Sequence, residues 1–116
     1  NVRILRYSEV LLMFAEAKLN GATTGNTSGK TALSAINEVR RRVKLTELNS
    51  VTLQDVYDER RAELALEENR YFDLIRTGRA QSILGSKGFV APKHNLFPIP
   101  NAQMQLNSNL IQNTGY

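Results

Sequence analysis

The fold is decided by the stretch DVYDERRAELALEENRYFDLIR, which covers residues 55–76 of the 116-residue chain. It lacks glycine and proline and is rich in Glu, Arg, Ala and Leu, which favour helix. Thr52 and Asp55 have the spacing of a capping box, with Asp in place of the usual Glu. We therefore expect one helix over about 53–67 and, after a break at 67–69, a second helix over 70–77.

Two charges of this stretch fall on its apolar side. At 100° per residue, one stripe of the helix contains the apolar residues Leu53, Tyr57 and Leu64. Arg60 and Glu67 lie in the same stripe, and an ionised group that faces a core is costly unless it is paired. Either both side chains extend along the surface to reach water, or Arg60 is buried and held by carboxylates. Glu9 and Glu16, seven residues apart, are candidate partners in the second case and ordinary solvated acids in the first.

Other helices follow from the apolar periodicity. The pattern predicts helices over 6–19 and 30–43, the first of them apolar on two sides and therefore buried between neighbours. A short helix is expected over 79–84 and one helical turn over 101–105. Glycines and prolines otherwise make 85–116 an irregular tail. The fold class is all-α, with helix pairs spaced as in helical repeats.

Four ordered motifs resemble the SusD/RagB family of nutrient-binding lipoproteins on the outer membrane of Gram-negative bacteria. They are ERRAELALEENRYFDLIRTG at 59–78, RYSEVLLMFAEA at 6–17, PIP at 98–100 and NSNLIQNTGY at 107–116. Together they span almost the whole chain. Ser108 and Thr114 stand where the family often has proline, which concerns only local loop shape. The resemblance implies a helical-repeat (TPR-like) scaffold.

The resemblance also implies a function and a place in the cell. It implies a non-catalytic surface protein that binds oligosaccharides or other nutrients and acts with a SusC-like TonB-dependent outer-membrane transporter. The chain, residues 1–116, would then be a C-terminal portion of a longer protein, and the lipid anchor and ligand-binding residues would lie upstream. A helical-repeat module that binds a peptide partner is the alternative.

No ligand-binding residue is assigned by the resemblance, which instead implies a structural role for the matched charges. We expect them to form an ion network that holds the fold together. Its members are Arg60, Glu63, Glu67, Arg70, Asp73 and Arg76.

Residue types exclude several other functions. The chain has no cysteine and one histidine, which argues against disulfides, thiolate chemistry and a structural zinc site. The stretch 25–31 is one residue too short between its glycines for a phosphate loop, and no strand precedes it. The arginines of 40–42 lie near acids and lack a wider basic face, which argues against nucleic acid. No nucleophile has a nearby base, so we expect no catalytic residue, no metal, no cofactor and no enzyme activity.

Three features of the C-terminal half stay open. Residues 74–116 contain four cations and no acid, a basic surface that suits an acidic partner or serves solubility. Tyr71 and Phe72 are either core residues or a platform for stacking sugars. His94 is expected to be an exposed or backbone-bonded loop residue rather than a catalyst or ligand.

Overall fold

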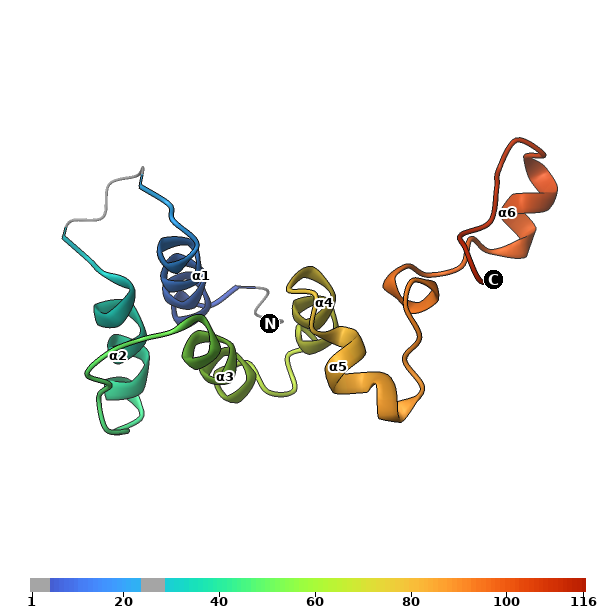
Figure 1. Cartoon of the computed structure of the whole chain (residues 1–116). Helices are drawn as coiled ribbons and strands as arrows, with labels where there is room; N and C mark the ends of the chain where they lie inside the picture. The colour runs from blue at the N-terminus through green and yellow to red at the C-terminus, as the bar shows by residue number, and fades with distance from the viewer. Residues whose placement is uncertain (1–4, 24–28) are drawn as a thin grey trace. The chain divides into compact units, whose positions relative to one another are not determined.

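The computed structural model describes residues 5–23 and 29–116, which fold into two compact units. The first unit, residues 1–68, contains α1 (Tyr7–Leu19), α2 (Ala32–Arg42) and α3 (Leu53–Glu63) (Figure 1). The second, residues 69–116, contains α4 (Arg70–Arg76), α5 (Ala80–Leu84), α6 (Asn101–Leu106) and the 3-10 turns Gly85–Lys87 and Lys93–Asn95. The described residues form no strand, which confirms the all-α prediction. Residues 24–28, with Gly25 of the rejected phosphate loop, lie outside the described residues.

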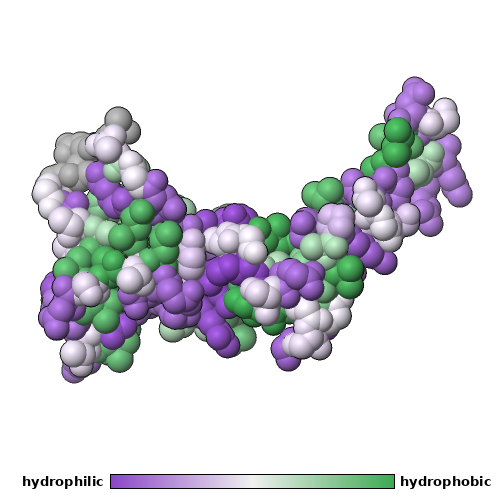
Figure 2. Space-filling model, in the orientation of Figure 1, coloured by the Kyte–Doolittle hydropathy of each residue, from purple (hydrophilic) through white to green (hydrophobic). Residues whose placement is uncertain are grey.

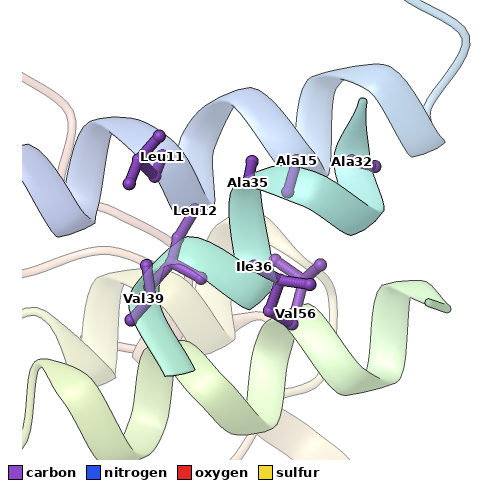
Figure 3. Packing of buried hydrophobic residues seen from close by; sticks show 8 residues of the cluster. All are labelled: Leu11, Leu12, Ala15, Ala32, Ala35, Ile36, Val39 and Val56. Carbon is purple, nitrogen blue, oxygen red and sulfur yellow. The ribbon is translucent and has the colours of Figure 1, made fainter. Parts of the chain in front are cut away.

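The core of the first unit lies where α1 packs against α2 and α3. Figure 3 shows Leu12 of α1, Ile36 and Val39 of α2, and Val56 of α3 converging between the three helices. All four side chains are buried to 99% or more. The cluster is completed by Leu11, Ala15, Ala32 and Ala35. Three helices thus share one core, to which α1 and α2 each contribute an apolar stripe of helical period and α3 contributes Val56.

Hydrophobic side chains also gather on the surface of the first unit (green in Figure 2). α1 buries Leu11, Leu12 and Ala15, whereas Val10 and Met13 are 40% and 41% exposed. The helix is therefore apolar on two sides, as the sequence predicts, but only one side is buried within this unit.

The end of α3 differs from the prediction. The helix ends at Glu63 rather than 67, so the predicted end was wrong. Leu66 and Glu68 take left-handed backbone angles, with φ of 67° and 63°, which interrupt a right-handed helix. The N–H of Glu67 donates to the Leu64 carbonyl at 3.2 Å, while the Glu63 carbonyl accepts 2.7 Å from Arg6 Nη2. A side chain from elsewhere thus satisfies one of the orphan carbonyls at the helix end. The remaining predicted bounds of α1, α2 and α4 lie within two residues of those observed.

The start of α3 is fixed by the expected capping box. The Asp55 N–H donates to Thr52 Oγ1 at 3.2 Å, and the Thr52 N–H donates to Asp55 Oδ2 at 2.8 Å. Thr52, through its side chain and then its backbone, holds the pKa of the Asp55 carboxyl below its ordinary value. The cap therefore satisfies two backbone donors reciprocally.

Replacing Thr52 by alanine is expected to lower the free energy of unfolding by about 1 kcal/mol, since the cap hydrogen bond is lost. Urea unfolding followed by circular dichroism measures the change. Thr46→Ala is the matched control, because Thr46 is exposed and lies outside any helix. Equal stability of the two variants would contradict a stabilising role for the cap.

The second unit has a smaller core and an ordered tail. Leu74, Ala80 and Phe89 are its buried hydrophobic residues. Within the tail, Gln112 binds both backbone groups of Ile99: its Oε1 accepts from the Ile99 N–H at 2.8 Å, and its Nε2 donates to the Ile99 carbonyl at 2.9 Å. Because the prolines on either side of Ile99 lack an N–H, the glutamine meets the sole backbone donor of the Pro-Ile-Pro segment. The two C-terminal motifs are therefore joined by the side-chain amide of Gln112.

Candidate functional site

Arg6 connects the start of α1 to the end of α3. It is the N-cap residue of α1, and its Nη1 lies 2.8 Å from Glu63 Oε1. Its Nη2 and Nε contact the two carboxylate oxygens of Glu67 at 2.7 and 3.1 Å. The planar guanidinium thereby engages two carboxylates and one carbonyl at once, a geometry that lysine cannot reproduce.

The side chain of Glu63, the last residue of α3, contacts residues at the ends of both other helices of the first unit. Besides Arg6, it accepts hydrogen bonds of 2.7 and 2.8 Å from Arg42 Nη2 at the end of α2. Its side chain is only 7% exposed. Burial opposes its ionisation, but Ser8, Arg6 and Arg42 outweigh that effect and hold the pKa of Glu63 below its ordinary value. We call Arg6, Arg42, Glu63 and Glu67 the Glu63 cluster.

Two further ion pairs tie the same helices together. Arg60 of α3 is 5% exposed, and its Nη2 lies 3.7 Å from Glu9 Oε1 of α1. Arg40 of α2 binds the buried Glu59 of α3 at 2.6 Å and donates to the Thr46 carbonyl at 2.8 Å. The side chain of Arg60 is therefore buried against a carboxylate of a neighbouring helix and does not reach water along the surface.

The six residues expected to form one ion network fall in both units. Arg60, Glu63 and Glu67 lie in the first unit, at the contacts just described. Asp73 and Arg76 pair with each other in α4 of the second unit, with 2.8 Å between Asp73 Oδ1 and Arg76 Nη2, and Arg70 is the first residue of that helix. The structure thus places Glu63 and Glu67 on one shared cation and pairs Arg60 with a different helix.

The cations that complete these contacts are missing from the sequence-based set. Arg6 and Arg42 bind Glu63, and Arg40 binds Glu59. Arg40 and Arg42 belong to the arginine run of 40–42, in which Arg41 forms an exposed pair with Glu47. The sequence signal for these cations is their position. Arg6 is the first residue of the motif at 6–17, and Arg42 is the last residue of α2, whose side chain reaches Glu63 at the end of α3.

The low pKa of Glu63 gives the first unit a specific acid sensitivity. Above its ordinary value of 4.5 the carboxyl is ionised in the folded and unfolded states, and its stabilisation is fully present. As the pH falls from there through the lower folded pKa, the unfolded state binds the proton first and this stabilisation is lost. We expect Glu63→Gln to be less stable than wild type near neutral pH, with the difference narrowing in acid.

Urea unfolding at several pH values between about 7 and about 3 measures this narrowing. Glu68→Gln, at an exposed position, is the control and should track wild type throughout. If the difference in free energy of unfolding between wild type and Glu63→Gln stayed constant as the pH fell, the predicted coupling between the ionisation of Glu63 and stability would be wrong.

Each unit also has a pocket. The first, of about 460 Å³, is lined by Leu5, Arg6, Tyr7, Ser8, Leu11, Glu38, Val39 and Arg42. The second, of about 280 Å³, is lined by Tyr71, Leu84, Lys87, Gly88, Phe89 and His94. Tyr71 is half-buried and its ring meets those of Phe72, Phe89 and Phe97 at 5.8–6.3 Å, whereas Phe72 and Phe97 are 60% and 67% exposed. The aromatics thus supply both core and surface.

His94 is bonded to the backbone, as predicted. Its Nδ1 accepts a 2.8 Å hydrogen bond from the Val90 N–H. In residues 5–23 and 29–116, no group of three or more metal-binding side chains comes together. Nor does any helix in those ranges have the length and apolar character needed to cross a bilayer.

The fold and its contacts define an all-α helical-repeat scaffold whose helices are joined by ion pairs. The model of the SusD family matches residues 1–95, and the chain belongs to this family. It is 34% identical to the SusD-like protein P2 of Formosa agariphila, with 97% of this chain and 25% of that protein aligned. It is also 34% identical to the starch-binding protein SusD of Bacteroides thetaiotaomicron, over 91% of this chain and 21% of that protein.

Solved structures show the same fold. A laminarin-binding SusD-like protein superposes with a TM-score of 0.86 at 37% identity, over 99% of this chain and 23% of that chain. The surface glycan-binding protein A of Bacteroides uniformis gives a TM-score of 0.75 at 33% identity, over 96% and 27%. The TPR-like, all-α prediction and the family resemblance are confirmed. The chain spans about a quarter of the length of the curated relatives it matches.

Proposed function

We propose that this chain belongs to a non-catalytic protein that binds oligosaccharides at the outer-membrane surface. In this proposal it delivers them to a SusC-like TonB-dependent transporter. The observation that carries the proposal is family membership together with the two relatives named for starch and laminarin binding. To bind an oligosaccharide and pass it to a transporter, a protein needs a rigid scaffold and a binding surface but no reacting group.

The charged residues of the family signature act as structural elements in this proposal. Arg6, Arg60 and Glu63 of the family motifs are engaged within the first unit, where they join three helices together with Arg42, which lies outside those motifs. Cations and carboxylates held by one another in this way are costly to redirect toward a neutral sugar. Oligosaccharide contacts are therefore expected elsewhere, on surfaces whose polar groups and rings remain available.

Isothermal titration calorimetry on the full-length protein tests the proposal with a panel of α- and β-glucan oligosaccharides. We expect saturable binding of at least one glycan, and chromatography of the same mixture should show no shortened products. Co-purification of a TonB-dependent transporter from detergent-solubilised outer membranes tests the partnership. Release of shorter sugars would contradict the non-catalytic role, and failure of every glycan to bind would contradict the proposal itself.

The peptide-binding alternative rests on the helical-repeat packing alone. The 460 Å³ pocket of the first unit is its natural site. Family membership favours the glycan, and a peptide library screened against the same protein separates the two.

A further inference from the structure

We propose that the pocket of the second unit is a subsite for an acidic sugar, one that carries a carboxylate or a sulfate. This inference rests on the proposed glycan-binding function and names the chemical class of the ligand. Its basis is a pocket lined by aromatic rings, an unpaired ammonium group and a fixed histidine in a unit that is strongly cationic.

The size and lining of the pocket suit one sugar ring. Its volume of about 280 Å³ lies just below the range of about 300–1,000 Å³ found for sites that hold drug-sized ligands. The rings of Tyr71 and Phe89 line it with their centroids 6.3 Å apart, and Phe89 and His94 are 5.6 Å apart. Phe89 is buried in the core of the unit, whereas the half-buried ring of Tyr71 provides apolar surface of defined orientation that the C–H face of a pyranose can cover.

The wall that contains His94 is held in place before any ligand arrives. The Tyr71 hydroxyl donates to the His94 carbonyl, and the His94 N–H donates to the Val90 carbonyl at 2.9 Å. The Ala91 N–H donates to Gln81 Oε1 at 2.9 Å. A wall fixed by four hydrogen bonds, including that from Val90 to the imidazole, lowers the ordering cost of binding.

Two donors of this lining suit an anion. Because Nδ1 of His94 accepts from the Val90 N–H, the neutral imidazole carries its proton on Nε2 and is a donor there. Lys87 is exposed, and among the residues that the structure describes its ammonium group takes part in no ion pair. An ammonium that meets a carboxylate or sulfate forms a charge-assisted hydrogen bond, roughly twice as strong as a neutral one.

The charge of the second unit favours the same ligand class. It contains one acid, Asp73, which is paired with Arg76. Its cations are Arg70, Arg76, Arg79, Lys87 and Lys93, so the net charge of +4 of the whole chain resides in this unit. Such a surface attracts an anionic oligosaccharide over a distance set by the ionic strength. A neutral glucan gains nothing from it.

Titration calorimetry on the full-length protein tests the inference with three probes: laminarihexaose as the neutral sugar, an oligogalacturonate as the carboxylate, and a carrageenan oligosaccharide as the sulfate. We expect one of the two acidic sugars to bind at least about tenfold more tightly than the neutral one, with the preference falling as salt is added. The two acidic arms identify which anion the pocket takes.

Lys87→Met is the decisive variant because Lys87 is exposed and its loss leaves the fold intact. The substitution should lower the affinity for the acidic sugar by about tenfold to a hundredfold, because one charge-assisted hydrogen bond is lost. The affinity for laminarihexaose should stay unchanged. Lys93→Met is the matched control: Lys93 lies in the same unit, but its Nζ sits 5.0 Å from the centre of the Tyr116 ring and it does not line the pocket. It should change neither affinity by more than about twofold.

Three results overturn the inference. Neutral binding without acidic preference leaves the proposed function standing and removes the acidic subsite. If Lys87→Met prefers acidic over neutral sugars as strongly as wild type does, the anion binds somewhere other than this pocket. No binding of any of the three sugars, or of the glucan panel, removes both the subsite and the proposed function.

Discussion

Replacing Arg60 by glutamate is expected to unfold the first unit. The side chain of Arg60 is buried and faces Glu9, so the substitution places two carboxylates against each other inside the protein. Breaking a buried ion pair costs about 3–5 kcal/mol, a large share of the total stability of about 5–15 kcal/mol. Circular dichroism should show loss of helix or a strongly lowered midpoint of urea unfolding.

The neighbouring residue offers a matched control. Arg61 follows Arg60 in α3 but is exposed, so Arg61→Glu should stay within about 0.5 kcal/mol of wild type. If Arg60→Glu folded with normal stability and lost only a ligand, Arg60 would be a binding residue and its structural role would be wrong.

Truncation of Leu12 to alanine is expected to have the next largest effect. Leu12 is fully buried where α1 meets Ile36 and Val39 of α2 and Val56 of α3 (Figure 3). The cavity left between three helices can close only in part, so the free energy of unfolding should fall by about 2–5 kcal/mol. Urea unfolding gives the value directly.

Met13 provides the comparison on the same helix. It is 41% exposed, so Met13→Ala should cost well below half of the Leu12→Ala value. Equal costs for the two variants would mean that the exposed side of α1 is covered as fully as the core side.

The helices could be predicted because their signals are local. Thr52 and Asp55 mark the start of α3, and the apolar period of Ile36 and Val39 marks the buried stripe of α2. The two apolar sides of α1 are also visible in the sequence, but which side packs within the unit depends on where α2 and α3 lie.

The partners of the charges could not be predicted because they are set by tertiary geometry. Arg6 and Glu63 are 57 residues apart, and no periodicity relates them. The end of α3 belongs to the same problem, since Arg6 takes the carbonyl that a longer helix would have used internally. Likewise, the double hydrogen bond between Gln112 and Ile99 is seen only once the tail is folded.

The central claim is that the charges of the family signature hold the three helices of the first unit together. A double-mutant cycle between Arg6→Met and Glu63→Gln, measured by urea unfolding at neutral pH, tests it most directly. We predict that each single variant is destabilised and that the two residues are coupled by about 1 kcal/mol or more. Coupling within about 0.3 kcal/mol of zero, with glycan affinity lost at unchanged stability, would contradict the claim and make these residues part of a binding site.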